Sequence, residues 1–127
     1  MRALLDVNVL IALLNSDHLH HARAMGWLAG NIGDGWASCP LTQNGCIRIM
    51  SQPGYPGAVL PTVIAERLAE ATATAHHVFW PDAISLLTDG LIEWRNVLGS
   101  RQVTDAYLLA LAVNKAGGWL CSTARCL

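Results

Sequence analysis

Short apolar runs alternate along the chain with longer stretches whose apolar residues recur at helical spacing. The runs expected to form strands are residues 3–5, 36–39, 77–80 and 119–122. The stretches expected to form helices are 9–14, about 18–29, 41–50, 62–74 and 103–116. Because strands and helices alternate, the pattern predicts an α/β fold in which helices flank a mainly parallel sheet.

Polar residues mark where several of these elements begin. Asp17 is expected to cap the second helix. The pattern is weaker between the third predicted strand and the last helix. There Asp82 or Ser85 is expected to open a short helix that runs through Leu87, and residues 91–94 form either a strand or a packed loop.

Length and composition indicate a single folded domain over residues 1–127. Hydrophobic residues make up 53% of the chain and charged residues 13%, which is far from the composition of a disordered chain. The formal net charge of −1 argues against a broad basic surface that binds duplex nucleic acid through its phosphates. A nucleic acid substrate is not excluded, because an enzyme can hold phosphates through bound divalent cations.

The cysteines and the start of the chain indicate a cytoplasmic protein. No cysteine interval matches the paired spacing of a zinc site, so Cys39, Cys46, Cys121 and Cys126 are expected to be reduced. The N-terminal segment reaches Asp6 too early for a secretory signal, and no apolar run approaches the ~18 residues of a membrane span. We therefore expect a soluble protein with no membrane association.

Asp6 is the first candidate functional residue. It directly follows the first predicted strand, and ligands of parallel α/β sheets bind in the crevice outside the carboxyl ends of the strands. The same position also suits a cap of the following helix, a role that Asn8 could share. Position in the sequence leaves both interpretations open.

Asp105 is the second candidate. It follows Thr104 and stands in the first predicted turn of a helix that is otherwise almost wholly apolar. Burying a lone carboxylate there is costly unless it caps the helix or coordinates a cation. If the fold brings Asp6 and Asp105 to one end of the sheet, they could share Mg²⁺ or Mn²⁺, and such an ion can activate water against a phosphodiester.

The histidines are expected to have structural roles. His18, His20 and His21 are close in sequence but poorly spaced for a metal site, and His76 and His77 lie beside a predicted strand. Two other active-site motifs are missing from the sequence. The glycines after the second helix precede a strand instead of forming a phosphate loop, and no Gly-x-Ser-x-Gly elbow occurs.

Four motifs occur along the chain in a fixed order. They are LLDVNVLIAL at 4–13, CPLTQNG at 39–45, QVTDAYLLALA at 102–112 and GGWL at 117–120. In this order and at this separation they resemble the PIN domain, and specifically the toxin nucleases of VapC type. The resemblance covers nearly the whole chain and implies a three-layer α/β/α PIN-like domain.

The resemblance also implies a site and its partners. Asp6 and Asp105 would be the metal ligands, for Mg²⁺ or Mn²⁺, while Asn8 and Thr104 would support the site. RNA would be the substrate. A VapB-like antitoxin and a second copy of the chain, forming a homodimer, would be the protein partners.

The chain departs from the family pattern at two acidic positions. Gln43 occupies the place of a usual Glu, and an amide brings no negative charge to a cation. Ala124 stands where the last motif of the family has an Asp, and family members usually continue beyond the position of Leu127. Asp82 or Asp89 would compensate only if the fold brings one of them close.

Two hypotheses about function follow. The first is a metal-dependent endoribonuclease, the toxin of a toxin–antitoxin pair, with Asp6, Asp105 and Gln43 in the active site. The alternative is a catalytically impaired PIN module that binds RNA or an antitoxin. A phosphotransferase of the haloacid dehalogenase type would need a second Asp two residues after Asp6, where this chain has Asn8.

Overall fold

The computed structural model describes residues 1–121, so that Ala124 and Cys126 lie outside the described residues. The strands are β1 (Ala3–Leu5), β2 (Trp36–Ser38), β3 (His77–Phe79) and β4 (Gly118–Leu120). The α-helices are α1 (Val7–Leu14), α2 (His21–Asn31), α3 (Pro40–Met50), α4 (Pro61–Thr72) and α5 (Arg101–Asn114). Two short 3₁₀ turns are η1 (Ile32–Asp34) and η2 (Trp94–Asn96).

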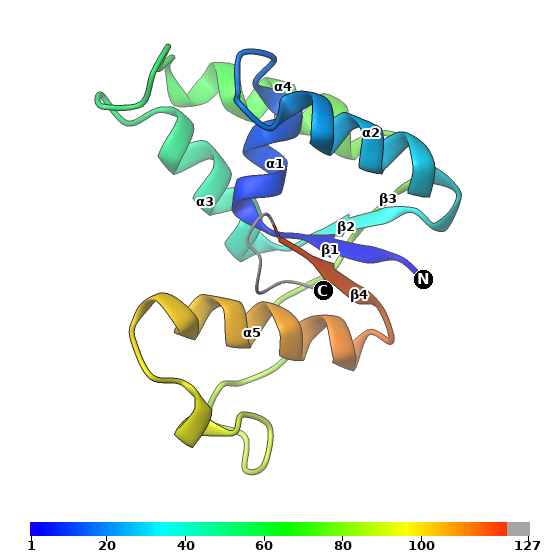
Figure 1. The fold of residues 1–127 in the computed structure, drawn as a ribbon, viewed down its shortest axis with the longest axis vertical. Helices are drawn as coiled ribbons and strands as arrows, with labels where there is room; N and C mark the ends of the chain where they lie inside the picture. The colour runs from blue at the N-terminus through cyan, green and yellow to red at the C-terminus, as the bar shows by residue number, and fades with distance from the viewer. Residues whose placement is uncertain (122–127) are drawn as a thin grey trace.

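The four strands form one parallel sheet in the order β3-β2-β1-β4. Helices α1 to α4 cover one face of this sheet, and α5 lies on the other face (Figure 1). The predicted α/β architecture, with helices on both faces of a parallel sheet, is therefore confirmed. All four strands end at the same edge, where α1 and α3 begin.

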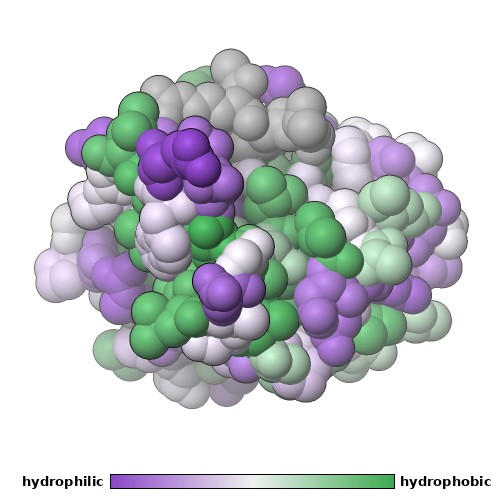
Figure 2. Space-filling view, turned by 90° about the horizontal axis from the view of Figure 1, so that it is seen from below, coloured by the Kyte–Doolittle hydropathy of each residue, from purple (hydrophilic) through white to green (hydrophobic). Residues whose placement is uncertain are grey.

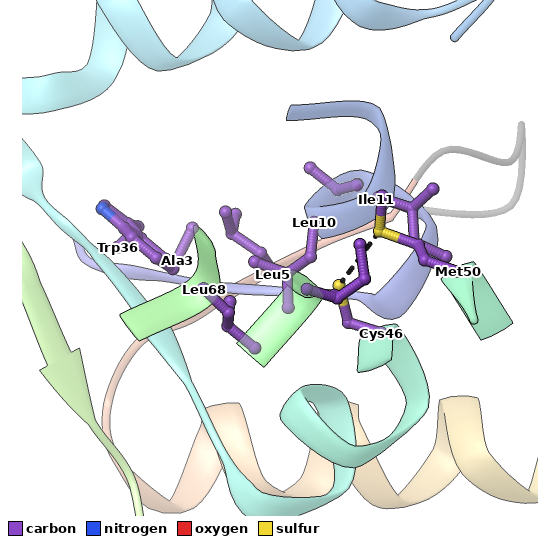
Figure 3. Close-up of a cluster of buried hydrophobic side chains, with 10 residues drawn as sticks. Ala3, Leu5, Leu10, Ile11, Trp36, Cys46, Met50 and Leu68 are labelled. Atoms are coloured by element: carbon purple, nitrogen blue, oxygen red, sulfur yellow. Dashed lines mark hydrogen bonds between the residues drawn. The ribbon is translucent and has the colours of Figure 1, made fainter. Parts of the chain in front are cut away.

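Alternate residues of β1 contribute to two hydrophobic clusters, one on each face of the sheet. Ala3 and Leu5 face α1, α3 and α4, whereas Leu4 faces α5. Figure 3 shows the first cluster, in which Leu5 meets side chains of α1 and α3; there the Cys46 thiol lies 3.8 Å from the Met50 sulfur. Because both faces of β1 are covered, this strand is wholly apolar, as is usual in parallel sheets, whereas β2 ends with Ser38 and β3 begins with His77.

The link between α1 and α2 differs from the prediction. The Asn15 side chain accepts a hydrogen bond from the Asp17 amide at 3.0 Å, and the His18 ring accepts one from the His20 amide at 3.0 Å. These local bonds hold the backbone in turns that compete with a helix. Helix α2 therefore begins at His21, and the prediction that Asp17 caps it is wrong.

The segment between β3 and α5 also differs. The Ser85 hydroxyl accepts a hydrogen bond from the Leu87 amide at 3.1 Å, which forms a turn instead of the predicted short helix. Residues 91–93 form a loop and not a strand; Leu91 and Ile92 in it are half-buried, and the exposed Trp94 begins η2. Figure 2 shows this side of the molecule, where apolar side chains gather near the centre of the face.

The cysteines match the expectation in part. Cys39 and Cys46 are free and buried. Cys121 is disulfide-bonded, so that the expectation of a reduced thiol is wrong for this residue. Among the described residues, no helix has both the length and the apolar character needed to cross a membrane.

Candidate metal centre

Asp6 lies where β1 passes into α1, at the carboxyl edge of the sheet. Its amide donates to the carbonyl of Leu120 on β4 at 2.8 Å, which fixes the backbone at this point. Its carboxylate accepts a hydrogen bond from the Val7 amide at 2.8 Å and is the N-cap of α1. The capping role considered from the sequence is therefore observed. This bond occupies one carboxylate oxygen, so it leaves the other available to a ligand.

Asp105 lies on α5, across the sheet edge from the start of α1. The helix begins at Arg101, so Asp105 is its fifth residue and not part of its first turn, which contains no acidic residue. The capping alternative for Asp105 is therefore wrong. Asp105 is half-buried and lines a groove of about 670 Å³ beside α5.

The two carboxylates lie close enough to interact. Burial raises the pKa of Asp6, the Val7 amide lowers it, and the nearby Asp105 carboxylate raises it further. Asp6 is only 7% exposed, so its ionised form loses most of its hydration in addition to this repulsion. A cation between the carboxylates would offset both costs, so the pair is a candidate functional site.

Gln43 lies on α3, whose start is fixed by a reciprocal cap. The Cys39 amide donates to the Thr42 hydroxyl at 3.0 Å, and that hydroxyl donates to the Cys39 carbonyl at 3.1 Å. Gly45 lets α3 approach α1 closely, because a Cβ at this position would lie 2.8 Å from a methyl group of Val7. The first half of α3 therefore lies against the residue that follows Asp6.

Other predicted residues have different surroundings. Asn8 and Thr104 are both exposed, one on the first turn of α1 and the other beside Asp105 on α5. Asp82 is exposed and follows β3, which β2 separates from β1. Burial raises the pKa of Tyr107 to about 12, and the Asp82 carboxylate contributes to this rise, which places Asp82 near Tyr107.

The available donors fit a hard, hydrated cation. Within residues 1–121 no three His, Cys, Asp or Glu side chains gather into one metal-binding group. Mg²⁺ is commonly held by one or two carboxylates and keeps several waters, so Asp6, Asp105 and an amide oxygen are a compatible set. The histidine cluster packs locally instead, since the His21 ring lies 2.7 Å from the Ala12 carbonyl.

Two polar residues behind Gln43, the buried Ser38 and the half-buried His77, were not singled out as site residues from the sequence. Ser38 is fully buried at the end of β2, and the Gln43 amide nitrogen donates to its hydroxyl at 2.9 Å. The same hydroxyl lies 2.8 Å from Nε2 of His77 on β3. No sequence signal joins these residues, because they are 39 positions apart and meet only when β2 and β3 pair.

Comparison with known proteins gives a consistent set of relatives, although no family model matches the chain. Ribonuclease VapC44 of Mycobacterium tuberculosis is 51% identical over 117 residues, which cover 92% of this chain and 82% of that protein. Ribonuclease VapC39 of the same organism is 41% identical over 118 residues, covering 92% and 85%. Ribonuclease VapC38 is 44% identical over 111 residues, covering 87% and 77%.

These relatives match most of this chain, and most of their own length is covered in return. The similarity to VapC44 and VapC39 covers about nine tenths of the chain. The chain belongs to the VapC family of ribonucleases, the PIN-domain toxins of toxin–antitoxin systems.

Proposed function

We propose that the protein is a metal-dependent endoribonuclease whose centre is formed by Asp6 and Asp105, with Mg²⁺ or Mn²⁺ as the cofactor. One observation carries the proposal. Two carboxylates from distant parts of the chain lie at the carboxyl edge of the sheet, near enough that Asp105 raises the pKa of the buried Asp6. A pair of this kind is costly to ionise without a cation, and family membership supplies RNA as the substrate.

The residues of the site have separate tasks in this mechanism. When bound, a divalent cation supplies positive charge for a scissile phosphate and lowers the pKa of an attacking water. Asp6 is held rigidly by its cap to Val7, so it gives the site a fixed anionic oxygen. Asp105 comes from the opposite side and, being half-buried, can reach both cation and solvent. We assign Asn8 and Thr104, exposed beside these acids, to hydrogen bonds with RNA.

Gln43 gives the site an acceptor oxygen without a charge. We therefore propose that cation affinity is lower than a glutamate at this position would give. The same feature favours the second candidate function, a catalytically impaired module that binds RNA or the antitoxin. The two candidates share the fold and differ in whether two carboxylates hold the ion tightly enough for turnover.

We propose a VapB-like antitoxin and a second copy of the chain as protein partners, acting in the cytoplasm. The face that carries α5 supports this proposal, because Leu109 is 49% and Val113 69% exposed there. Both line the groove that also contains Asp105. A partner seated in this groove would cover the way to the acidic pair. Light scattering of the purified chain tests the homodimer.

An RNA cleavage assay tests the proposed function. Single-stranded RNA of mixed sequence would be incubated with Mn²⁺ and the parent protein, Asp6→Asn, Asp105→Asn or Gln43→Glu. The control is Asp89→Asn, which removes an exposed carboxylate in the turn between β3 and α5. We expect cleavage by the parent and the control, loss in both site variants, and faster cleavage by Gln43→Glu.

Two other outcomes would change the conclusion. Activity confined to Gln43→Glu would favour the impaired module. Absence of cleavage by every protein, including Gln43→Glu, would contradict the ribonuclease proposal. Cleavage that persists in Asp6→Asn and Asp105→Asn would show that the acidic pair is not its centre.

A further inference from the structure

A chain of hydrogen bonds leads from the candidate site into the sheet. The Gln43 amide nitrogen donates to the Ser38 hydroxyl at 2.9 Å, and that hydroxyl lies 2.8 Å from Nε2 of His77. Ser38 is fully buried, and the His77 ring is held against Trp36 with ring centroids 4.5 Å apart. The hydrogen bonds therefore join Ser38 and His77, two side chains that packing already holds in place.

The Gln43–Ser38 hydrogen bond has a defined direction, and the Ser38–His77 bond can continue it. The Ser38 hydroxyl accepts the Gln43 N–H, so its own hydrogen is free to be donated to Nε2 of His77. If this hydrogen goes to Nε2 of His77, Nε2 is unprotonated and the ring hydrogen lies on Nδ1. Burial lowers the pKa of His77, a hydrogen bond to the Thr72 carbonyl raises it, and the Arg2 guanidinium lowers it.

The same direction fixes the orientation of the Gln43 amide. Its nitrogen points inward to Ser38, so its carbonyl oxygen is the atom left for other partners. Resting on the proposed function, we propose that Ser38 and His77 are positioning residues that hold Gln43 with its carbonyl oxygen turned toward the acidic pair. Gln43 would thereby present an acceptor for a cation or an RNA hydroxyl, and not a donor that would repel the cation.

A carboxylate at position 43 would reverse the direction of these hydrogen bonds. Glutamate has no hydrogen to donate, so the Ser38 hydroxyl would donate to the carboxylate and accept from Nε2 of His77. Nε2 would then carry a hydrogen. Gln43 and an unprotonated Nε2 of His77 are therefore a matched pair, and the protonation of Nε2 reports which residue occupies position 43.

The first experiment reads this state directly and does not depend on catalysis. Long-range ¹⁵N–¹H NMR of the histidine rings would be recorded near pH 7.5 for the parent, Gln43→Glu and Ser38→Ala. His77→Gln identifies the signal, and His76→Gln, which changes the exposed neighbour, is the control. We expect an unprotonated Nε2 in the parent and a protonated one in Gln43→Glu. A protonated Nε2 in the parent, or no change in Gln43→Glu, would overturn the proposal.

The second experiment tests the link to the reaction with a double-mutant cycle. Ser38→Ala is expected to lower kcat for RNA cleavage roughly tenfold, the upper range for one neutral hydrogen bond, with little change in KM. Ser38→Thr, which keeps the hydroxyl, should restore most of kcat. In a Gln43→Ala background Ser38→Ala should have no further effect, because the group that it positions is gone.

The two proposals fail in different ways. Independent, multiplicative effects of Ser38→Ala and Gln43→Ala would show that Ser38 acts only on the stability of the sheet. A parent without nuclease activity would contradict the proposed function, while the NMR experiment would still decide the direction of the hydrogen-bond chain.

Discussion

Asp6 has two effects on stability that two substitutions can separate. Its carboxylate caps α1 through the Val7 amide at 2.8 Å, and its charge is buried beside Asp105. Asp6→Asn keeps an oxygen for the cap and removes the charge. Asp6→Ala removes both. The difference in unfolding free energy between the two variants therefore measures the contribution of the cap. The difference between Asp6→Asn and the parent measures the contribution of the charge.

The size of the capping effect follows from its geometry. Replacing an N-cap Asp or Asn by Ala costs about 1 kcal/mol, within a range of roughly 0.5–2. An unfolding entropy of about 2.1 cal/mol/K per residue gives a chain of 127 residues roughly 270 cal/mol/K, so that this cost lowers Tm by about 4 °C. We expect Asp6→Ala to melt about 4 °C below Asp6→Asn at every pH.

The charge effect depends on pH, and its sign follows from the raised pKa of Asp6. A carboxyl whose pKa is higher in the folded protein than in the unfolded chain favours folding most when it is protonated. That relative stability is lost as pH rises through the folded pKa. Without cations, Asp6→Asn should therefore be more stable than the parent at neutral pH, and the gap should close as pH falls below the folded pKa.

Urea and thermal unfolding in a chelating buffer between pH 4 and 8 would measure both effects. Equal stability of Asp6→Asn and Asp6→Ala would show that the cap contributes nothing. A parent that is more stable than Asp6→Asn at neutral pH would refute the claim that the ionised carboxylate is held at a cost.

Three further predictions concern packing and the buried thiols. Gly45→Ala places a Cβ 2.8 Å from the stiff side chain of Val7, so we expect a net loss of about 1 kcal/mol in urea unfolding. Gly26→Ala on α2 meets nothing within 4 Å and should stabilise by roughly 0.5–1 kcal/mol; equal effects of the two would contradict the close approach of α3 to α1. Leu108→Ala, at a fully buried position of α5, should cost about 2–5 kcal/mol, and a loss below 1 kcal/mol would show that α5 packs loosely. Burial raises the thiol pKa of Cys46 to about 12, so a thiol reagent at pH 8 should label it only on unfolding, and rapid labelling of the native protein would contradict this.

Strong periodicity explains which parts of the fold were predictable. Helix α5 and the parallel sheet were predicted because their apolar residues form long or continuous patterns. The start of α2 was not predicted correctly. The side chains of Asn15 and His18 accept hydrogen bonds from nearby backbone amides, and whether such bonds displace a helix depends on the geometry of the turn. The segment after β3 has too few apolar residues at regular spacing to show whether it is helical. The turn at Ser85 could therefore not be distinguished from a short helix.

The site could be predicted for similar reasons, and only in part. Asp6 and Asp105 stand out because a charged residue follows a buried strand or interrupts an apolar helix. Gln43 was found by resemblance to the family. The orientation of its amide depends on Ser38 and His77, which approach it only in the folded sheet, so no pattern along the chain reveals it.

The central claim is that Asp6 and Asp105 hold one cation, and a calorimetric titration with Mn²⁺ tests it most directly. The parent, Asp6→Asn and Asp105→Asn would be titrated, with Asp89→Asn as the matched control. We predict one binding event in the parent and the control, and its loss in both site variants. Absence of binding in the parent at millimolar Mn²⁺, or binding that survives both site substitutions, would contradict the account.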